Sequence, residues 1–435
     1  MPGAEGPAKV VGNSAVKNTC DMHSAVLSTR SQVLLMALLL GATTINWIDR
    51  QVLSVLAPFL RDEFHLSNSD YAAILNAFML TYSVAMPLAG RLLDRLGVGR
   101  GLSLAVAWWS LAGMFTSLAR GPVSMGLFRS LLAMGEAGAW PSFAKAVAIW
   151  IPRNWRTLAM GVCNSGSSLG AMIAPVVVVF LTQHFSWRFA FLLTGSLGFL
   201  WVGAFQIFRL AHPQMRQTEQ GLPGSTGKAH TNWRQLLRYR QTWAVFVCRF
   251  LADPLWYFFV FWIPEFLSRE RGLSLAAIGA VAWVPFLVSD LSNFTTGWIA
   301  LVLQRSGWSV DRTRKTVMFV GAMVSPIGIA AAFCHSLLWT MVFICVAIFF
   351  WMAWSITVQT LPGDFFPARS VGSVYGFCGA GSTTGSVISI WLVGRILDTT
   401  HSYIAVFTLL GLLMPVAYVV GTALMGKVQR LDLGE

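Results

Sequence analysis

The chain has 435 residues, of which 55% are hydrophobic and only 11% are charged. So small a share of charged residues cannot cover the surface of a water-soluble protein of this length, so the composition indicates a membrane protein. The formal net charge of +13 would also fit a nucleic-acid-binding protein. However, the basic residues lie in short connections between apolar segments rather than along one face, so nucleic acid is not an expected partner.

Twelve apolar segments each come close to the ~20 residues that a bilayer-spanning helix needs. Backbone groups cannot stay unpaired in lipid, and these segments are too long and too unpatterned for barrel strands. We therefore expect an all-α polytopic membrane protein with twelve transmembrane helices. The predicted spans are 31–58, 71–93, 100–119, 123–147, 157–182, 188–210, 241–264, 274–303, 315–334, 337–361, 370–397 and 402–425.

The longest polar interruption separates six spans from the other six. Its Gly, Ser and Pro residues at 221–227 favour a flexible tether, and the short basic segment 232–238 is predicted to lie on the membrane surface. Two six-helix halves with a site between them are the organisation of a rocking transporter. The predicted divisions are a cytoplasmic tail, a six-helix bundle, a cytoplasmic linker, a second six-helix bundle and a second tail, at 1–30, 31–210, 211–240, 241–425 and 426–435.

The distribution of Lys and Arg predicts the orientation. Residues 1–30 lack the apolar core and cleavage site of a signal peptide, so we expect the first span to remain as a membrane helix. The connections on the same side as the N-terminus hold most of the basic residues, among them Arg153, Arg156 and Arg314, and the opposite connections hold few. The positive-inside rule therefore predicts cytoplasmic termini. The expected location is the inner (plasma) membrane.

Four charged residues interrupt the apolar spans: Asp49 and Arg50 in the first, and Arg129 and Glu136 in the fourth. A charge in hydrocarbon costs roughly 2.5–3.5 kcal/mol on insertion scales, so we expect these groups to face a polar cavity. Arg129 and Glu136 are seven residues apart, about two helical turns, and project from nearly the same face. Arginine suits a carboxylate ligand, and a buried carboxyl group can gain or lose a proton as substrate occupies its arginine. The pattern indicates an organic anion moved together with protons.

Several motifs resemble those of known transporters. The stretch from Gly90 to Arg100 resembles the G-x-L-x-D-R-x-G signature of the major facilitator superfamily. The further motifs are Ile48-Asp49-Arg50, Tyr82, Arg129 with Gly135-Glu136-Ala137, Trp140-Pro141, Asn164 to Gly170, Leu251 to Trp256 and Leu361 to Pro367. Together they are similar to the anion:cation symporter family, and among its members to bacterial hexuronate transporters.

The resemblance implies a proton-coupled symporter that imports a hexuronate, such as galacturonate or glucuronate, by alternating access. It implies substrate contacts from the first half at Arg50, Tyr82, Arg129, Asn164 and Ser167. It assigns the protons to Asp49 and Glu136, and we expect Asp94 and Arg95 to gate the cytoplasmic face. In the second half, hydrogen-bonding and aromatic side chains could hold the hydroxyl-rich body of a sugar acid, namely Trp256, Tyr257, Gln359 and Thr360.

Some of these residues also have simpler interpretations. Asp49 and Arg50 could lie solvated at the edge of their span, and Tyr82 could be a packed aromatic. Ser167 lies in a Gly/Ser-rich run that would equally allow close helix packing.

Other polar residues within the spans also leave alternatives open. Arg249 and Asp253 are four residues apart and can neutralise each other. Lys145 is predicted to be a snorkelling residue at a helix end, and Asp290 to be a helix-packing carboxylate beside Asn293. The sequence leaves open whether Asp253 and Asp290 take part in function.

Other chemistries have little support in the sequence. The six cysteines show no metal-ligand or redox spacing, the seven histidines form no cluster, and no phosphate-binding G-x-x-x-x-G-K-[ST] loop is present. We expect no cofactor and a monomer in contact with membrane lipid. The alternatives are a symporter for another carboxylate, such as an aldonate, glucarate or an aromatic acid, a drug exporter, or a polytopic membrane enzyme.

Overall fold

The computed structural model describes residues 27–66, 68–220, 233–273, 281, 283–400 and 402–431. All regular structure among these residues is helical. Most of the predicted N-terminal tail and the linker residues 221–232 lie outside the described residues, as does the start of the predicted span 274–303.

The described residues of the first half form eight α-helices and one 3-10 helix. Their boundaries are α2 Thr29–Val55, α3 Ala57–Phe64, α4 Asn68–Leu96, α5 Val98–Phe115, η1 Thr116–Leu118, α6 Pro122–Glu136, α7 Ala139–Trp150, α8 Arg156–His184 and α9 Trp187–Ala211. Ser28 and Ser186 begin α2 and α9 as N-caps, and each side chain accepts a hydrogen bond from a backbone amide of the first turn.

Two short helices, α10 Pro213–Gln220 and α11 Trp233–Leu236, lie between the halves. The second half then contains α12 Arg240–Arg271, α14 Val284–Arg305, α15 Val310–Val324, the 3-10 helix η2 Ser325–Ile329, α16 Ala330–Phe333, α17 Leu337–Phe365, α18 Ala368–Thr400 and α19 Tyr403–Met425.

Ten helical segments of the described chain are long and apolar enough to cross a membrane. The other two predicted spans are also helical. The span 241–264 lies within the 32-residue α12, which carries Arg249 and Asp253, and the span 123–147 is divided between α6 and α7. The predicted all-α polytopic fold is confirmed.

The fourth predicted span is broken immediately after Glu136. Pro141 has no backbone N–H to bond to the carbonyl of Ala137, so the helix cannot continue undisturbed through this point. The amide of Gly138 instead bonds to the carbonyl of Gly135, at 3.1 Å. The break therefore places Glu136 at the end of α6, inside the bundle.

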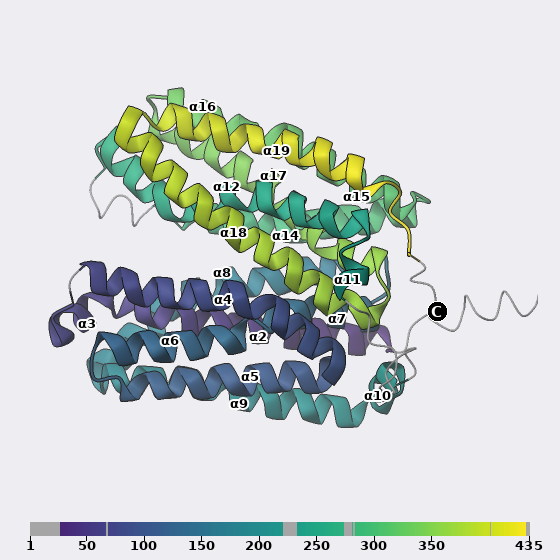
Figure 1. The fold of residues 1–435 in the computed structure, drawn as a ribbon, viewed down its shortest axis with the longest axis horizontal. Helices are drawn as coiled ribbons and strands as arrows, with labels where there is room; N and C mark the ends of the chain where they lie inside the picture. The colour runs from purple at the N-terminus through teal and green to yellow at the C-terminus, as the bar shows by residue number, and fades with distance from the viewer. Residues whose placement is uncertain are drawn as a thin grey trace, which may run out of the picture.

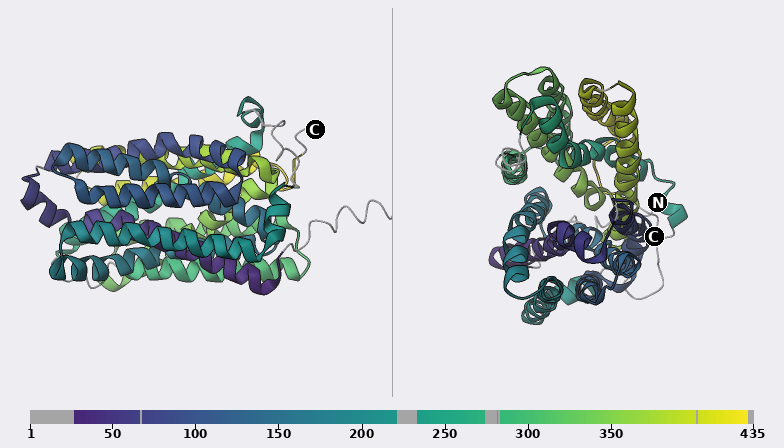
Figure 2. Two further views of the ribbon diagram at one scale, coloured as in Figure 1. Left: turned by 90° about the horizontal axis from the view of Figure 1, so that it is seen from below. Right: turned by 90° about the vertical axis from the view of Figure 1, so that its left-hand side faces the viewer.

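The helices form two bundles, with α2 to α9 in one and α12 to α19 in the other (Figure 1). The bundles meet at the end where the C-terminal residues lie and diverge toward the opposite end, beside α3. Seen from that opposite end, they are separate groups of helices (Figure 2, right). We call the end where Asp94 and Asp364 lie the closed end, and the other the open end.

Both ends of the described chain lie at the closed end. Ser31, at the start of α2, is 2.8 Å from the Nε2 atom of His212, which follows α9. The amide of Leu431 donates to the carbonyl of Phe365 at 2.7 Å. The two termini therefore leave the bundles on the same side.

Glycines bring α4 and α18 into backbone contact near the closed end. A Cβ atom added at Gly376 would lie 2.5 Å from the carbonyl oxygen of Met86, and one at Gly90 would meet the backbone of Gly372. Small residues at such crossings allow helix backbones to approach closely. The contact between the bundles at this end therefore depends on the absence of side chains.

We expect Gly376→Ala to lower the midpoint of thermal unfolding of the purified protein. The added methyl group meets backbone rather than a movable side chain, and overpacking of this kind costs about 1–3 kcal/mol. Gly394→Ala is the matched control, because it lies on the same helix and an added Cβ there would have nothing within 4 Å. Equal midpoints for the two variants would contradict the tight α4–α18 contact.

Candidate functional site

A polar cavity of about 120 Å³ lies between the two bundles. It is lined by side chains of both halves, so its walls change whenever the bundles move relative to each other. From the first half come Trp47, Arg50, Tyr82, Trp140, Asn164 and Ser167. From the second half come Arg249, Asp253, Trp256, Tyr257, Gln359 and Tyr375.

Arg50 is the positively charged residue that the first bundle brings to this cavity. Its Nε atom donates a hydrogen bond to Oε2 of Glu136, whose side chain is wholly buried. Its guanidinium carbon lies 4.8 Å from the centroid of the Tyr82 ring, where the ring face attracts a cation. Its Nη2 atom has no hydrogen-bond partner among the described residues. Arg50 thus lies at the cavity wall, its charge is balanced by Glu136, and its Nη2 atom is a donor without an acceptor.

Arg129 lies next to Arg50 but is not among the residues that line the cavity. Its guanidinium donates to the backbone carbonyls of Asp49, at 3.3 Å, and Arg50, at 2.9 Å. Arg129 and Glu136 therefore project from one face of α6, as their spacing predicts, and both reach α2. In this structure Arg129 holds the backbone of α2, which differs from the direct substrate contact that the resemblance implies.

Asp49 is buried, with 3% of the residue exposed, and it also does not line the cavity. Its Oδ2 atom has no hydrogen-bond partner among the described residues. The arrangement of Asp49 and Arg50 within a bundle differs from the solvated edge position that the sequence left open. A buried carboxyl group with one unpartnered oxygen therefore lies on α2 directly before the cavity-lining Arg50.

Tyr82, Ser167 and Asn164 all line the cavity. The hydroxyl of Ser167 is buried and has no partner in the described part of the chain. Asn164 donates from Nδ2 to Oε1 of Gln359 at 3.1 Å, and the hydroxyl of Tyr375 donates to the same oxygen at 3.1 Å. Gln359 therefore links the two bundles across the cavity. Ser167 adds a hydroxyl group without a partner to the cavity wall.

The Gly/Ser-rich run around Ser167 also packs against α2. An added Cβ at Gly166 would meet the Thr43 side chain, and one at Gly170 would lie 2.5 Å from the carbonyl oxygen of Thr44. The glycines of α8 allow close packing while Ser167 faces the cavity. The packing interpretation of this run therefore applies to Gly166 and Gly170, and the position at the cavity applies to Ser167.

Both aromatic residues predicted in the second half, Trp256 and Tyr257, line the cavity. Trp256 stacks on Trp351, with ring centroids 5.1 Å apart. Thr360 differs from the prediction: its hydroxyl donates to the carbonyl of Thr357 at 2.7 Å, and it does not line the cavity. Gln359 faces the cavity, and the next residue is turned about 100° around the helix, so Thr360 points elsewhere.

Asp290 belongs to a contact between α14 and α8 rather than to the cavity wall. Its Oδ1 atom lies 3.5 Å from Nδ2 of Asn293, and the same nitrogen lies 3.5 Å from the hydroxyl of Ser165. This position agrees with the packing role predicted for Asp290.

Asp94 joins the bundles at the closed end. Its carboxylate accepts hydrogen bonds from the backbone amides of Gly372, at 3.1 Å, and Ser373, at 2.6 Å, both in α18. Lys145 donates to it at 2.7 Å and is only 2% exposed, so the prediction of a snorkelling Lys145 is wrong. The neighbouring Arg95 is exposed on the surface.

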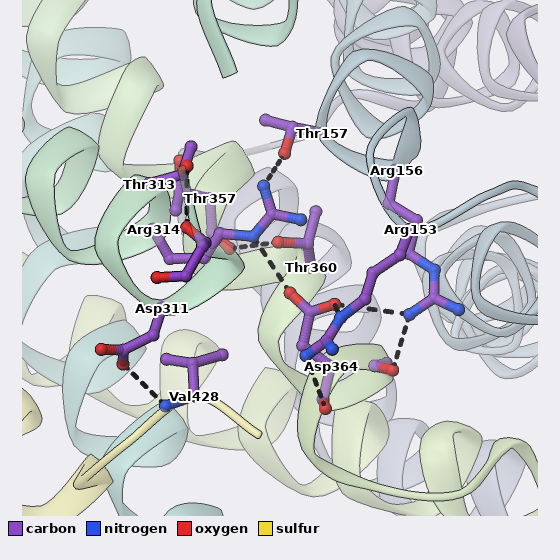
Figure 3. A network of polar contacts seen from close by, with 12 residues as sticks. Arg153, Arg156, Thr157, Asp311, Thr313, Arg314, Thr357, Thr360, Asp364 and Val428 are labelled. Carbon is purple, nitrogen blue, oxygen red and sulfur yellow. Dashed lines mark hydrogen bonds and ion pairs between the residues drawn. The ribbon is translucent and has the colours of Figure 1, made fainter. Parts of the chain in front are cut away.

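A second cluster at the closed end surrounds the buried carboxylate of Asp364 (Figure 3). Arg314 of the same bundle donates to it from Nε at 3.0 Å. Arg153 and Arg156 of the other bundle donate at 3.2 and 3.4 Å. Arg314 also bonds to Thr157 across the boundary. One carboxylate thus holds cations from both halves, and we call this set of residues the closed-end ion cluster.

Sequence reasoning missed two features of the site. It assigned Arg153, Arg156 and Arg314 to membrane topology and did not connect them to Asp364. It also treated Arg249 as an internal partner of Asp253, although both line the cavity. The only available signal was that these charges fall within or beside apolar spans. Among the described residues, no group of three or more His, Cys, Asp or Glu side chains could hold a metal ion.

Two helical bundles that enclose a polar cavity between them define a membrane transporter. The chain belongs to the Major Facilitator Superfamily, whose sequence model matches residues 39–305. The predicted membership is confirmed, and the protein is a transporter rather than an enzyme.

Curated relatives support the same family. The chain is 32% identical over 413 residues to the hexuronate transporter of Escherichia coli (strain K12), and this alignment covers 90% of this chain and 94% of the relative. It is 33% identical over 297 residues to the galacturonate transporter of Dickeya chrysanthemi, and this alignment covers 65% of this chain and 85% of that transporter. Among solved structures, the proton:xylose symporter XylE aligns with a TM-score of 0.71 at 14% identity, covering 91% of this chain and 96% of XylE. That last likeness shows the fold.

Proposed function

We propose that this transporter imports a hexuronate together with protons, by alternating access. The observation that carries the proposal is the pairing of Arg50, at the cavity wall, with the wholly buried Glu136. The names of the relatives from Escherichia coli and Dickeya chrysanthemi support a hexuronate as the substrate.

The cavity suits the size and chemistry of a sugar acid. About 10–15 Å³ of such volume holds one water molecule, so 120 Å³ accommodates on the order of ten heavy atoms. The substrate carboxylate binds Arg50, and the hydroxyl groups bond to Ser167, Asn164 and Gln359. The Trp256 ring covers the C–H face of the sugar.

Coupling follows from the competition for Arg50. When the substrate carboxylate takes the guanidinium, Glu136 loses charge compensation in a buried position, which is costly. Uptake of a proton by Glu136 removes that cost, and Asp49, one residue from Arg50, supplies a second proton site. Two protons with one monoanion move one net positive charge, worth about 2.3 kcal/mol per 100 mV of membrane potential.

The orientation completes the proposal. Positive-inside counting assigns the closed end and both termini to the cytoplasm of a cell whose inner membrane holds the protein as a monomer. In this conformation, Asp94 and the closed-end ion cluster join the bundles at the cytoplasmic side. Substrate enters from the open end, and both sets of contacts must break before it leaves.

The test is uptake of radiolabelled galacturonate and glucuronate into proteoliposomes under an imposed pH gradient. We expect accumulation of the uronates under the pH gradient, and no accumulation when neither a pH gradient nor a membrane potential is imposed. At symmetric pH, an inside-negative potential imposed with valinomycin should restore accumulation. Labelled galactonate serves as the competing acid that lacks the uronate ring. Accumulation of galactonate without either uronate would contradict the proposed substrate, and indifference to the potential would contradict the two-proton stoichiometry.

A further inference from the structure

Arg249 is the positively charged residue that the second bundle brings to the cavity, as Arg50 is that of the first. The two side chains are similarly accessible, at 13% and 20% exposed. A substrate in the cavity therefore meets a guanidinium group from each half of the protein.

The bonds of Arg249 leave part of its guanidinium unsatisfied. Its Nε atom donates to Oδ2 of Asp253 at 3.2 Å, and the group lies 5.1 Å from the centroid of the Tyr375 ring. Its Nη1 atom is buried and has no hydrogen-bond partner among the described residues. A buried charged donor without an acceptor is costly, and an acceptor supplied by a ligand would offset the cost.

This pattern repeats that of Arg50. Each arginine lines the cavity, is balanced through Nε by a carboxylate of its own bundle, packs on a tyrosine ring and keeps one terminal nitrogen without a partner. A purely structural pair of Arg249 and Asp253 on one helix would not need to face the cavity.

We propose that Arg249 is a second anion-binding residue, which binds the end of the substrate remote from Arg50. The inference rests on the proposed function and extends its substrate class to six-carbon acids with a carboxylate at both ends. Hydrogen bonds between a guanidinium and a carboxylate are roughly twice as strong as neutral ones, so the second carboxylate is the preferred ligand of Arg249. Such a substrate bridges the two bundles through its two charged ends.

The experiment compares the binding of galacturonate, with one carboxylate, and galactarate, with two, to the purified full chain by isothermal titration calorimetry. We expect Arg249→Gln to weaken galactarate binding at least tenfold and galacturonate binding less than threefold, because loss of a charged hydrogen bond typically has an effect of this size. Arg240→Gln, an exposed position at the start of the same helix, is the matched control and should change neither.

A double variant, Arg249→Gln with Asp253→Asn, removes both charges and so avoids leaving Asp253 buried and unpaired. It should show the same selective loss of galactarate binding. Normal galactarate binding by this double variant, or a wild type that binds galacturonate but not galactarate, would overturn the inference and leave the proposed function standing. A wild type that binds neither acid would overturn both.

Discussion

Replacing Arg50 with alanine is expected to lower hexuronate uptake into proteoliposomes at least 100-fold. The substrate carboxylate would lose hydrogen bonds to a charged group, each worth about 1.5–3 kcal/mol. Two such bonds exceed the ~2.8 kcal/mol that corresponds to 100-fold. The measurement is the initial rate of uptake of radiolabelled galacturonate at equal amounts of reconstituted protein.

Loss of Arg50 also leaves Glu136 buried without a counter-charge, which costs about 3–5 kcal/mol of stability. The double variant Arg50→Ala with Glu136→Gln separates the two effects, because it removes the charge of both partners. It should recover thermal stability without recovering the exchange of labelled for unlabelled galacturonate at equal pH, which Glu136→Gln alone should retain. Arg91→Gln, at an exposed position of α4, is the control for loss of one positive charge. Exchange near the wild-type rate by the double variant would show that Arg50 does not bind the substrate.

The second large effect is expected at the closed-end ion cluster. Asp364→Asn keeps the shape of the side chain but leaves Arg314, which is wholly buried, without its carboxylate partner. Breaking a buried ion pair in this way typically costs about 3–5 kcal/mol. Arg153 and Arg156 of the other bundle bind the same carboxylate, so the substitution also weakens two ion pairs between the bundles. These pairs stabilise only the conformation in which the bundles meet at the closed end. We therefore expect the closed end to open.

Opening can be measured as the distance between spin labels at Gln217 and Ser306, which are both exposed at the closed end. Gln217 lies in α10, which is bonded to the first bundle through Glu219, and Ser306 follows α14 of the second bundle. With the six cysteines replaced by alanine, Asp364→Asn should shift the population toward longer distances. Asp311→Asn is the matched control, because its carboxylate pairs with Lys315 at 2.9 Å within one bundle. An unchanged distance distribution in Asp364→Asn would mean that the cluster does not hold the bundles together.

Much of the fold was predictable because length and hydropathy determine where a chain crosses a bilayer. Where the structure describes them, the predicted spans correspond to helices, and the seven-residue spacing of Arg129 and Glu136 places both on one face of α6. Charges inside apolar segments also directed attention correctly to Arg50, which lines the cavity.

The rest required three-dimensional information. Periodicity shows which residues share a face, but not which helix lies against that face. It therefore could not show that Arg129 bonds to the backbone of α2, that Thr360 turns away from the cavity, or that Arg249 lines it. Nor does it indicate that Asp364 binds Arg153 and Arg156, which lie 211 and 208 positions earlier in the chain.

The central claim is that Glu136 carries a proton whose binding is linked to occupation of Arg50 by the substrate. Glu136→Gln fixes this position in an uncharged form, so the protein should still exchange labelled for unlabelled galacturonate at equal pH. It should fail to accumulate galacturonate against a gradient when a pH difference is imposed. Glu63, whose carboxylate pairs with Arg188 away from the cavity, provides the control. The variant Glu63→Gln should both exchange and accumulate galacturonate. Accumulation by Glu136→Gln to the wild-type level would contradict the account.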